Sequence, residues 1–218
     1  ESYENHLFEA DQLMQKASEL NPEDPQIWLL WGNIKRKANK LVEADEKYKI
    51  AYSLTPDNPI ILNAYGQTRG RLADYETALD LLNSALTIDS DFKSKKHEII
   101  NRTSIAETLL AWSELLLRDR NFEKSKDNLF KAENECKLAL KIDKNDEKSL
   151  GIYSKCHYKI GRFYTATNNI VEAKKYFYQC VQNESKGFGV ARYKLKAAIE
   201  LSKLLLKTNE YDEVKSIL

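Results

Sequence analysis

Proline, cysteine and glycine are all scarce in this 218-residue sequence. The four prolines fall within residues 22–59, in two short connections that read P-x-x-P, and no proline follows Pro59. Proline interrupts helices, so its absence from most of the chain leaves long helices permitted. The alternation of polar and apolar residues that is typical of strands is also absent, whereas apolar residues recur every three or four positions, as amphipathic helices require. The sequence therefore predicts an all-α protein.

The residues that usually build catalytic or metal sites are few. The three cysteines, Cys136, Cys156 and Cys180, form no C-x-x-C pair, and the three histidines form no H-x-x-x-H or H-E-x-x-H motif. The glycines of GFG, residues 187–189, precede no G-K-[ST] sequence and are expected to free a turn between helices. We therefore expect no catalytic role, no metal and no cofactor, with reduced core thiols and a packed His157 in a cytoplasmic protein.

Hydropathy argues against a membrane partner, and the net charge does not indicate any particular partner. No apolar run approaches the ~20 residues that span a bilayer, so we expect no membrane partner. Charged residues make up 31% of the chain, yet the net charge is only +1, so any electrostatic preference must come from where the charges lie. The sequence opens with Glu1 rather than methionine, and we expect it to be a segment of a longer protein.

A 34-residue period organises the first part of the chain. The stretch ASELNPEDPQIWLLWG, residues 17–32, aligns without a gap with AYSLTPDNPIILNAYG, residues 51–66. Alanines keep the same period, and small residues let two helices approach closely, so each period is predicted to hold one repeated helix pair. The predicted helices of the first two full units are 25–38, 41–54, 59–72 and 75–88.

These repeated residues resemble the tetratricopeptide repeat (TPR). The first full unit has Trp28-x2-Trp31-Gly32, then Ala44-x3-Tyr48-x2-Ala51, then Pro56, which is similar to the family pattern. The second full unit keeps Leu62, Tyr65, Gly66, Ala78, Leu82 and Ala85. Further along, Ile160, Gly161 and Tyr164, followed by Ala173, Phe177 and Cys180, have the same spacing. The large aromatic residues at these positions are expected to be core.

The resemblance implies a right-handed α–α superhelix, a TPR solenoid of about five repeats. The third unit departs most, with a second helix predicted over 122–142 and an insertion over 90–103 that forms a loop or an added helical turn. Extended helices are expected in the third and fourth full repeats. We predict a single solenoid domain over 1–218. Its units are a partial repeat at 1–24, regular repeats at 25–58 and 59–92, an extended repeat at 93–146, a repeat at 147–186 and a partial repeat at 187–218.

The resemblance also implies that the first helix of each pair lines a concave, peptide-binding side. The stripe predicted to be exposed on these helices has nine cations, with Glu107 and Glu114 as its only acids. Its other members include Leu110 on the third first helix. A concave surface focuses such a field toward acidic ligands, and amides can bond an extended backbone. The predicted partner-binding residues are Asn33, Arg36, Lys37, Asn63, Gln67, Arg71, Lys155, Tyr158 and Arg162. The predicted apolar anchors are Leu29, Ile60 and Tyr158.

The leading interpretation is a protein–protein interaction scaffold whose concave face binds an extended, acidic partner segment. One alternative is RNA binding through a basic concave groove, as in some interferon-induced tetratricopeptide proteins, which predicts strong salt dependence. A second alternative is a sensor or regulatory arm of a larger signalling NTPase or enzyme. Exposed apolar ends of the solenoid would in addition allow self-association.

Overall fold

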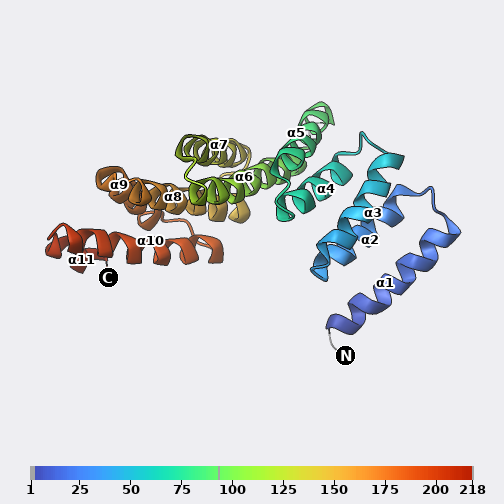
Figure 1. The fold of residues 1–218 in the computed structure, drawn as a ribbon, viewed down its shortest axis with the longest axis horizontal. Helices are drawn as coiled ribbons and strands as arrows, with labels where there is room; N and C mark the ends of the chain where they lie inside the picture. The colour runs from blue at the N-terminus through green and yellow to red at the C-terminus, as the bar shows by residue number, and fades with distance from the viewer. Residues whose placement is uncertain (1–2, 93, 218) are drawn as a thin grey trace. The chain divides into compact units, whose positions relative to one another are not determined.

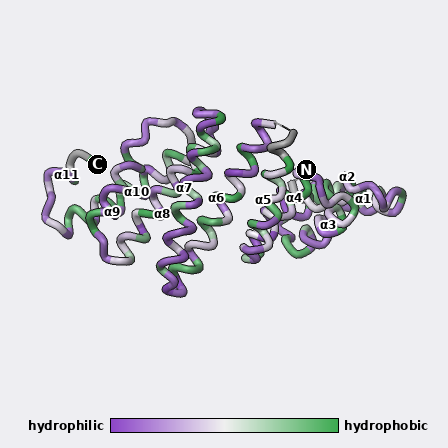
Figure 2. The backbone as a smooth tube through the Cα atoms, turned by 90° about the horizontal axis from the view of Figure 1, so that it is seen from above, coloured by the Kyte–Doolittle hydropathy of each residue, from purple (hydrophilic) through white to green (hydrophobic). Residues whose placement is uncertain are grey.

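The computed structural model describes residues 3–92 and 94–217, and the regular structure within these ranges is entirely helical (Figure 1). The eleven helices of the described residues are α1 (Tyr3–Leu20), α2 (Pro25–Lys37), α3 (Leu41–Leu54), α4 (Pro59–Arg71), α5 (Tyr75–Phe92), α6 (Lys95–Arg118), α7 (Phe122–Ile142), α8 (Glu147–Ala166), α9 (Ile170–Val181), α10 (Phe188–Lys207) and α11 (Tyr211–Ile217). The all-α prediction and the helix pairing are confirmed. Along each helix hydrophobic and hydrophilic segments alternate over short distances (Figure 2).

The chain divides into two compact units, residues 1–104 and 105–218, with the boundary inside α6. We call them the first unit and the second unit and describe each by itself. The single solenoid domain over 1–218 stays a prediction.

In each P-x-x-P connection the second proline begins the next helix. Pro25 and Pro59 occupy the first turns of α2 and α4, where the missing N–H would lack an intrahelical partner anyway. Ahead of them, Asp24 accepts from the backbone N–H of Gln26 at 2.8 Å, and Asn58 accepts from that of Ile60 at 2.9 Å. These caps satisfy amide groups that the first helical turn leaves open.

The irregular middle of the sequence is more helical than predicted. Most of the predicted insertion, residues 90–103, belongs to α5 and α6, because α5 reaches Phe92 and α6 begins at Lys95. Of the two forms predicted for the insertion, the loop is therefore wrong. Residue 93 lies outside the described residues. Extended helices in the third and fourth full repeats are confirmed, since α6, α7 and α8 have 24, 21 and 20 residues.

The core of the first unit depends on a close approach between first and second helices. Tyr48 of α3 is fully buried and lies against Gly32 of α2, where an added Cβ would meet its ring at 2.5 Å. Ala44 and Ala51, one helical turn on either side, are also fully buried. Small residues on one helix thus make room for the large ring on the other, as the repeat pattern predicted.

The second unit repeats this arrangement with different residues. Phe177 of α9 is fully buried and lies against Gly161 of α8, where an added Cβ would meet its ring at 2.6 Å. Ala173 and Cys180 flank it at the spacing of Ala44 and Ala51 and are fully buried too. No described helix of either unit is long and apolar enough to cross a membrane.

We predict that Gly32→Ala destabilises the first unit. Alanine favours a helix over glycine by about 1 kcal/mol, but its Cβ would overlap the Tyr48 ring and force buried side chains to move. The expected net loss is about 1–2 kcal/mol in the free energy of unfolding, measured by urea titration with tryptophan fluorescence. Gln26→Ala, at an exposed site on the same helix, is the control. Equal stabilities of the two variants would contradict the tight contact.

Candidate functional site

The nine predicted partner-binding residues fall into two groups. Six lie on α2 and α4 in the first unit, and Lys155, Tyr158 and Arg162 lie on α8 in the second unit. Each group is therefore a candidate surface of its own unit.

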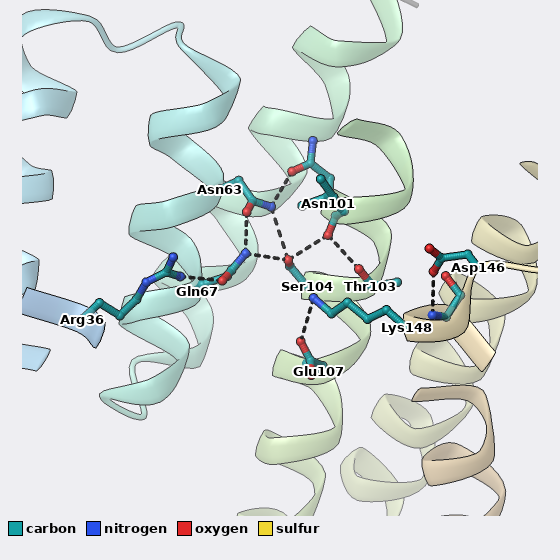
Figure 3. A network of polar contacts seen from close by, with 11 residues as sticks. Arg36, Asn63, Gln67, Asn101, Thr103, Ser104, Glu107, Asp146 and Lys148 are labelled. Atoms are coloured by element: carbon teal, nitrogen blue, oxygen red, sulfur yellow. Dashed lines mark hydrogen bonds and ion pairs between the residues drawn. The ribbon is translucent and has the colours of Figure 1, made fainter. Parts of the chain in front are cut away.

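Side-chain hydrogen bonds connect the predicted residues of the first unit (Figure 3). Arg36 donates to Gln67 at 2.6 Å and to Asn33 at 3.2 Å. Gln67 in turn donates to Asn63 at 2.5 Å and to Ser104 at 3.0 Å. Three consecutive first helices, α2, α4 and the start of α6, are thus joined by polar side chains, and these amides already have partners within the chain.

Asn63 is a correction to the predicted surface. It is 8% exposed, and its amide donates to Asn101 at 2.5 Å and to Ser104 at 3.3 Å. A buried amide must find such partners because an unpaired one costs stability. Asn63 therefore lies beneath the surface and orients Gln67 by accepting its hydrogen bond. The prediction that Asn63 is exposed is wrong.

Two predicted apolar positions are also wrong. Leu29, expected to be an exposed anchor, is 4% exposed and packs into the core beside Tyr48, and Leu110 of the third stripe is fully buried. The exposed aliphatic residue on α2 is Leu30, at 52%. Ile60 of α4 is 49% exposed, as predicted. On α2, Leu29 thus belongs to the buried side together with Trp31 and Gly32, and Leu30 belongs to the exposed side.

The two remaining predicted residues of the first unit, Lys37 and Arg71, lie with exposed Leu30 and Ile60 on α2 and α4. We call these four residues the mixed surface, because they combine charged and apolar side chains. Lys37 is exposed at the end of α2, and exposed Arg71 at the end of α4 donates to Asn39 at 2.8 Å. Asn39 has a φ of 60° in the turn after α2, a conformation that asparagine tolerates well. This contact places the Arg71 guanidinium beside the turn that follows Lys37. Leu30 and Ile60 supply apolar area on the same two helices.

An ion pair that the sequence analysis missed attaches α1 to α2. Nζ of Lys35 lies 2.8 Å from a carboxylate oxygen of Asp11 and 2.6 Å from one of Glu43, and Trp31 donates to Asp11 at 2.6 Å. Burial opposes the charge of Lys35, but the two carboxylates outweigh it and raise the pKa of the amine. Beside this cluster lies a cavity of about 370 Å³, bounded in part by Phe8 and Lys37.

Aromatic rings surround the predicted Tyr158 in the second unit. Its ring centroid lies 5.7 Å from that of Tyr193 and 6.1 Å from that of Phe177. The ammonium group of Lys196 sits 5.9 Å from the Tyr158 centroid and 5.5 Å from the Tyr193 centroid. A cation at this distance from a ring is attracted by its electron-rich face. Tyr158 is therefore partly used for internal packing and is half-buried.

A cavity of about 580 Å³ opens next to this ring cluster. Charged residues from α6, α8 and α10 line it, and exposed Phe188 stands at its edge. The charged lining residues are Glu107, Glu147, Lys148, Lys155 and Arg192. At its base α8 and α10 approach closely, since a Cβ added to Gly189 would lie 3.1 Å from the Cα of Gly151. Gly187, with a φ of 140°, turns the chain into α10 as predicted for GFG.

The two anions of the predicted stripe are paired. Glu107 lies 3.4 Å from Nζ of Lys148, as Figure 3 shows, and Glu114 pairs with Lys159. Burial lowers the pKa of Lys159, although Glu114 opposes this shift. Both acids are thus matched by a lysine of α8, while exposed Arg162 has no ion pair within the described residues. Around the cavity the cations Lys155, Arg162, Arg192 and Lys196 outnumber the one further acid, Glu147.

Buried polar groups elsewhere in the second unit match the expected packing roles. His157 is 7% exposed, and its Nε2 lies 3.1 Å from Oε1 of Glu133. Burial would raise the pKa of Glu133, but the hydrogen bonds with His157 and Lys137 hold it below its ordinary value. All three cysteines are free and buried, and burial raises the pKa of Cys180 to about 12. Among the described residues, no group of three or more possible ligands could hold a metal ion.

Comparisons with known proteins support the fold. No family model matches the sequence, and neither does any curated protein. The crystal structure of BtubC from P. vanneervenii has a TM-score of 0.63 at 12% identity, covering 100% of this chain and 89% of that one. YrrB, described as a TPR protein with an unusual peptide-binding site, has a TM-score of 0.52 at 14% identity, covering 94% and 88%. The human IFIT1 dimer with m7Gppp-AAAA has a TM-score of 0.54 at 15% identity, covering 91% of this chain and 49% of that one. The chain therefore has a TPR-like helical-repeat fold.

We predict that the Glu133 pair stabilises the second unit mainly above pH 4.5. Because the folded-state pKa of Glu133 lies below the ordinary glutamate value of 4.5, its stabilisation is present above the unfolded pKa and is lost as the pH falls through the folded pKa. Glu133→Gln removes the charge and is expected to cost about 1–3 kcal/mol at neutral pH. The difference from the wild type should shrink as the pH falls below 4.5 and through the folded-state pKa. Urea titrations across this range measure it.

Glu123→Gln, at an exposed position near the start of the same helix, is the matched control. The same pH dependence in both variants would contradict a specific contribution from the buried pair.

Proposed function

We propose that this chain is a protein-interaction scaffold and that the first-helix surface of its second unit binds an extended, acidic segment of a partner protein. The observation that carries the proposal is the cavity of about 580 Å³ beside Lys155 and Arg192, next to the ring cluster of Tyr158 and Tyr193. Such a site offers a concave space for a side chain, cations for carboxylates and aromatic area for apolar groups. Binding sites of this kind join an apolar anchor to a charged rim.

A peptide fits the charge pattern of the cavity better than a polyphosphate does. Glu107 and Glu147 also line the cavity, and they would repel a polyphosphate, which is charged throughout, more than a segment in which carboxylates alternate with uncharged residues. A peptide backbone, in contrast, carries N–H donors that carboxylates accept. YrrB, a TPR protein with an unusual peptide-binding site, has a similar fold, which supports peptide as the ligand class.

The mixed surface of the first unit is a second candidate position for the same kind of ligand. Lys37 and Arg71 provide the charge there, and Leu30 and Ile60 provide the apolar area. Arg36 of α2 donates a hydrogen bond to Gln67 of α4 at 2.6 Å, and this bond connects the two helices. Their bond would have to open or be shared for either side chain to contact a partner.

RNA is the alternative ligand for the second unit. The human IFIT1 dimer with m7Gppp-AAAA shows that a similar fold is found with RNA. The lysine above two tyrosine rings, Lys196 over Tyr158 and Tyr193, offers the cation and stacking surface that single-stranded nucleic acid uses. We also retain the prediction of a cytoplasmic protein, which rests on the three free, buried thiols.

A double charge reversal tests the proposed site. Lys155→Glu with Arg162→Glu should weaken binding of a fluorescent acidic peptide, kept extended by alternating prolines, by about tenfold or more, because two attractive charges become repulsive. Fluorescence anisotropy measures the change, and circular dichroism checks that helicity is retained. Lys141→Glu with Lys144→Glu is the matched control, since these exposed lysines lie at the end of α7 and just after it.

The same assay distinguishes the other outcomes. Weakening by Arg71→Glu alone would move the site to the first unit. Tighter binding of single-stranded RNA than of any acidic peptide, with a steep loss in added salt, would replace the peptide by RNA. Equal affinity of both double variants would reject the second-unit site.

A further inference from the structure

A second cavity of the second unit, about 430 Å³ in volume, is lined by α7, α8 and the chain at the end of α9. A helix turns by about 100° per residue, so Tyr153 and His157 lie on the opposite side of α8 from Gly151 and Lys155, which line the cavity described above. The second cavity is therefore a separate site. We call it the amide cavity, and its lining includes Leu150, Tyr153, His157, Gln179, Gln182 and Asn183.

The helix that follows in the chain uses another side of α9. α11 and the turn before it contact α9 through Lys174, which pairs with Glu210, and through Tyr178, which donates to Glu213. Gln179 lies about 140° around α9 from Lys174, on the side that faces the amide cavity. The cavity therefore stays open in the presence of the next helices, and it is a feature of the folded second unit.

His157 gives the amide cavity a polar atom that the fold does not use. The side chain is 7% exposed, and its Nε2 lies 3.1 Å from Oε1 of Glu133. The pKa of Glu133 lies below its ordinary value, so at neutral pH a carboxylate accepts the proton of Nε2–H. Nδ1 of the neutral ring is then an acceptor. Within the described residues Nδ1 has no hydrogen-bond partner, and it is not sealed from solvent.

Two amide side chains stand on the wall opposite α8. Gln179 and Gln182 are exposed, and their amides have no hydrogen-bond partner within the described part of the chain. Asn183 next to them is bonded inward, since it donates to Ser154 at 3.0 Å and accepts from the backbone N–H of Ser185 at 3.0 Å. Asn183 thus fixes the segment that presents the two glutamines.

The remaining lining is flat and uncharged. The half-buried ring of Tyr153 lies with its centroid 4.4 Å from that of His157, and burial raises the pKa of Tyr153 to about 12, so its hydroxyl keeps its proton at neutral pH. None of the described residues that line the cavity is aspartate, glutamate, lysine or arginine, although 31% of the chain is charged. A ligand of matching chemistry is uncharged and planar, and it carries both donors and acceptors.

We propose that the amide cavity binds the base of a nucleoside. The face of the base stacks on Tyr153, one of its N–H groups donates to Nδ1 of His157, and its edge exchanges hydrogen bonds with Gln179 and Gln182, as glutamine does with adenine. A peptide amide offers the same hydrogen bonds but a smaller flat face. A free nucleoside and a base of single-stranded RNA share this chemistry, and the uncharged lining favours the free nucleoside because a phosphate would find no cation there.

The first experiment observes the three histidines of the 1–218 chain by NMR, with isotope labels in their rings. Adenosine, guanosine, cytidine and uridine are titrated one at a time. At least one of them should shift the ring resonances of His157 and leave those of His6 and His97 in place. His157→Gln assigns the His157 resonances by their loss.

Two sets of variants test the lining. Gln179→Ala with Gln182→Ala should weaken binding of that nucleoside about tenfold, because two hydrogen bonds are lost. Glu184→Ala, at an exposed position of the same segment that does not line the cavity, is the matched control. Tyr153→Leu should weaken binding by about tenfold or more, whereas Tyr153→Phe keeps the stacking face and should retain it. Circular dichroism verifies that each variant folds.

Three outcomes would overturn the proposal. One is unchanged His157 resonances with all four nucleosides, and another is equal affinity of the double glutamine variant and the wild type. The third is tighter binding of an RNA strand of the same base with a steep loss in added salt, because RNA would then be the ligand. Lys155→Glu with Arg162→Glu should leave nucleoside binding unchanged, so that this proposal and the extended-segment site can fail separately.

Discussion

The close approach of a small residue to a large ring is the contact on which the α2–α3 and α8–α9 helix pairs depend. Gly32 faces Tyr48 in the first unit, and Gly161 faces Phe177 in the second. Since an added methyl group would lie 2.5–2.6 Å from ring atoms, this contact restricts the rotation of α2 and of α8 about their axes. Once that rotation is fixed, the residues that point away from the second helix are fixed as well, and they form the surfaces proposed to bind a partner.

The same constraint produces chemically different surfaces in the two units. In the first unit, Arg36, Gln67 and Asn63 bond to one another, so much of the polar capacity of the surface serves to hold α2, α4 and the start of α6 together. In the second unit, ring contacts and lysine–ring contacts hold α8 to α10, and a cavity remains beside them. Because the rings are used for packing, the backbone and the carboxylates of the proposed peptide would be bound by the charged residues that line the cavity. This difference favours the second unit as the place where a ligand binds.

The sequence predicted the helices well because their determinants are local. Pro25 and Pro59 with the caps before them set the starts of α2 and α4, and the periodic alanines and glycines set the pairing. Burial of Asn63 could not be predicted, because its partners Asn101 and Ser104 lie in the part of α6 where the repeat period is interrupted. Their register relative to α4 follows from packing and not from a sequence spacing.

Only part of the candidate surface could be predicted from the sequence, because some of its residues depend on the packing of neighbouring helices. Lys37, Arg71 and Arg162 are exposed as expected, since long cations stay in solvent in almost any register. Leu29 and Leu30 are adjacent leucines, and the sequence alone gives no ground for burying one and exposing the other. Leu29 is the buried one because it packs in the core cluster that contains Tyr48.

The exposed apolar residues of α10, among them Leu195 and Ile199, extend this reasoning from the core to the surface. The equivalent turns at Asn168 and Asn209 align α8 with α10. In α8, the positions that match this face of α10 are occupied by residues that suit a covered contact, namely Gly151 at the closest approach and the half-buried ring of Tyr158. α10 has Arg192 and Ile199 at these positions, and Leu195 where α8 has the buried Ser154. Larger apolar residues at the same positions are not needed to close the second unit, because the opposite face of α10 already supplies Ala197, Leu201 and Leu205 to the core. The exposed apolar residues of α10 are therefore separate from the core of the second unit.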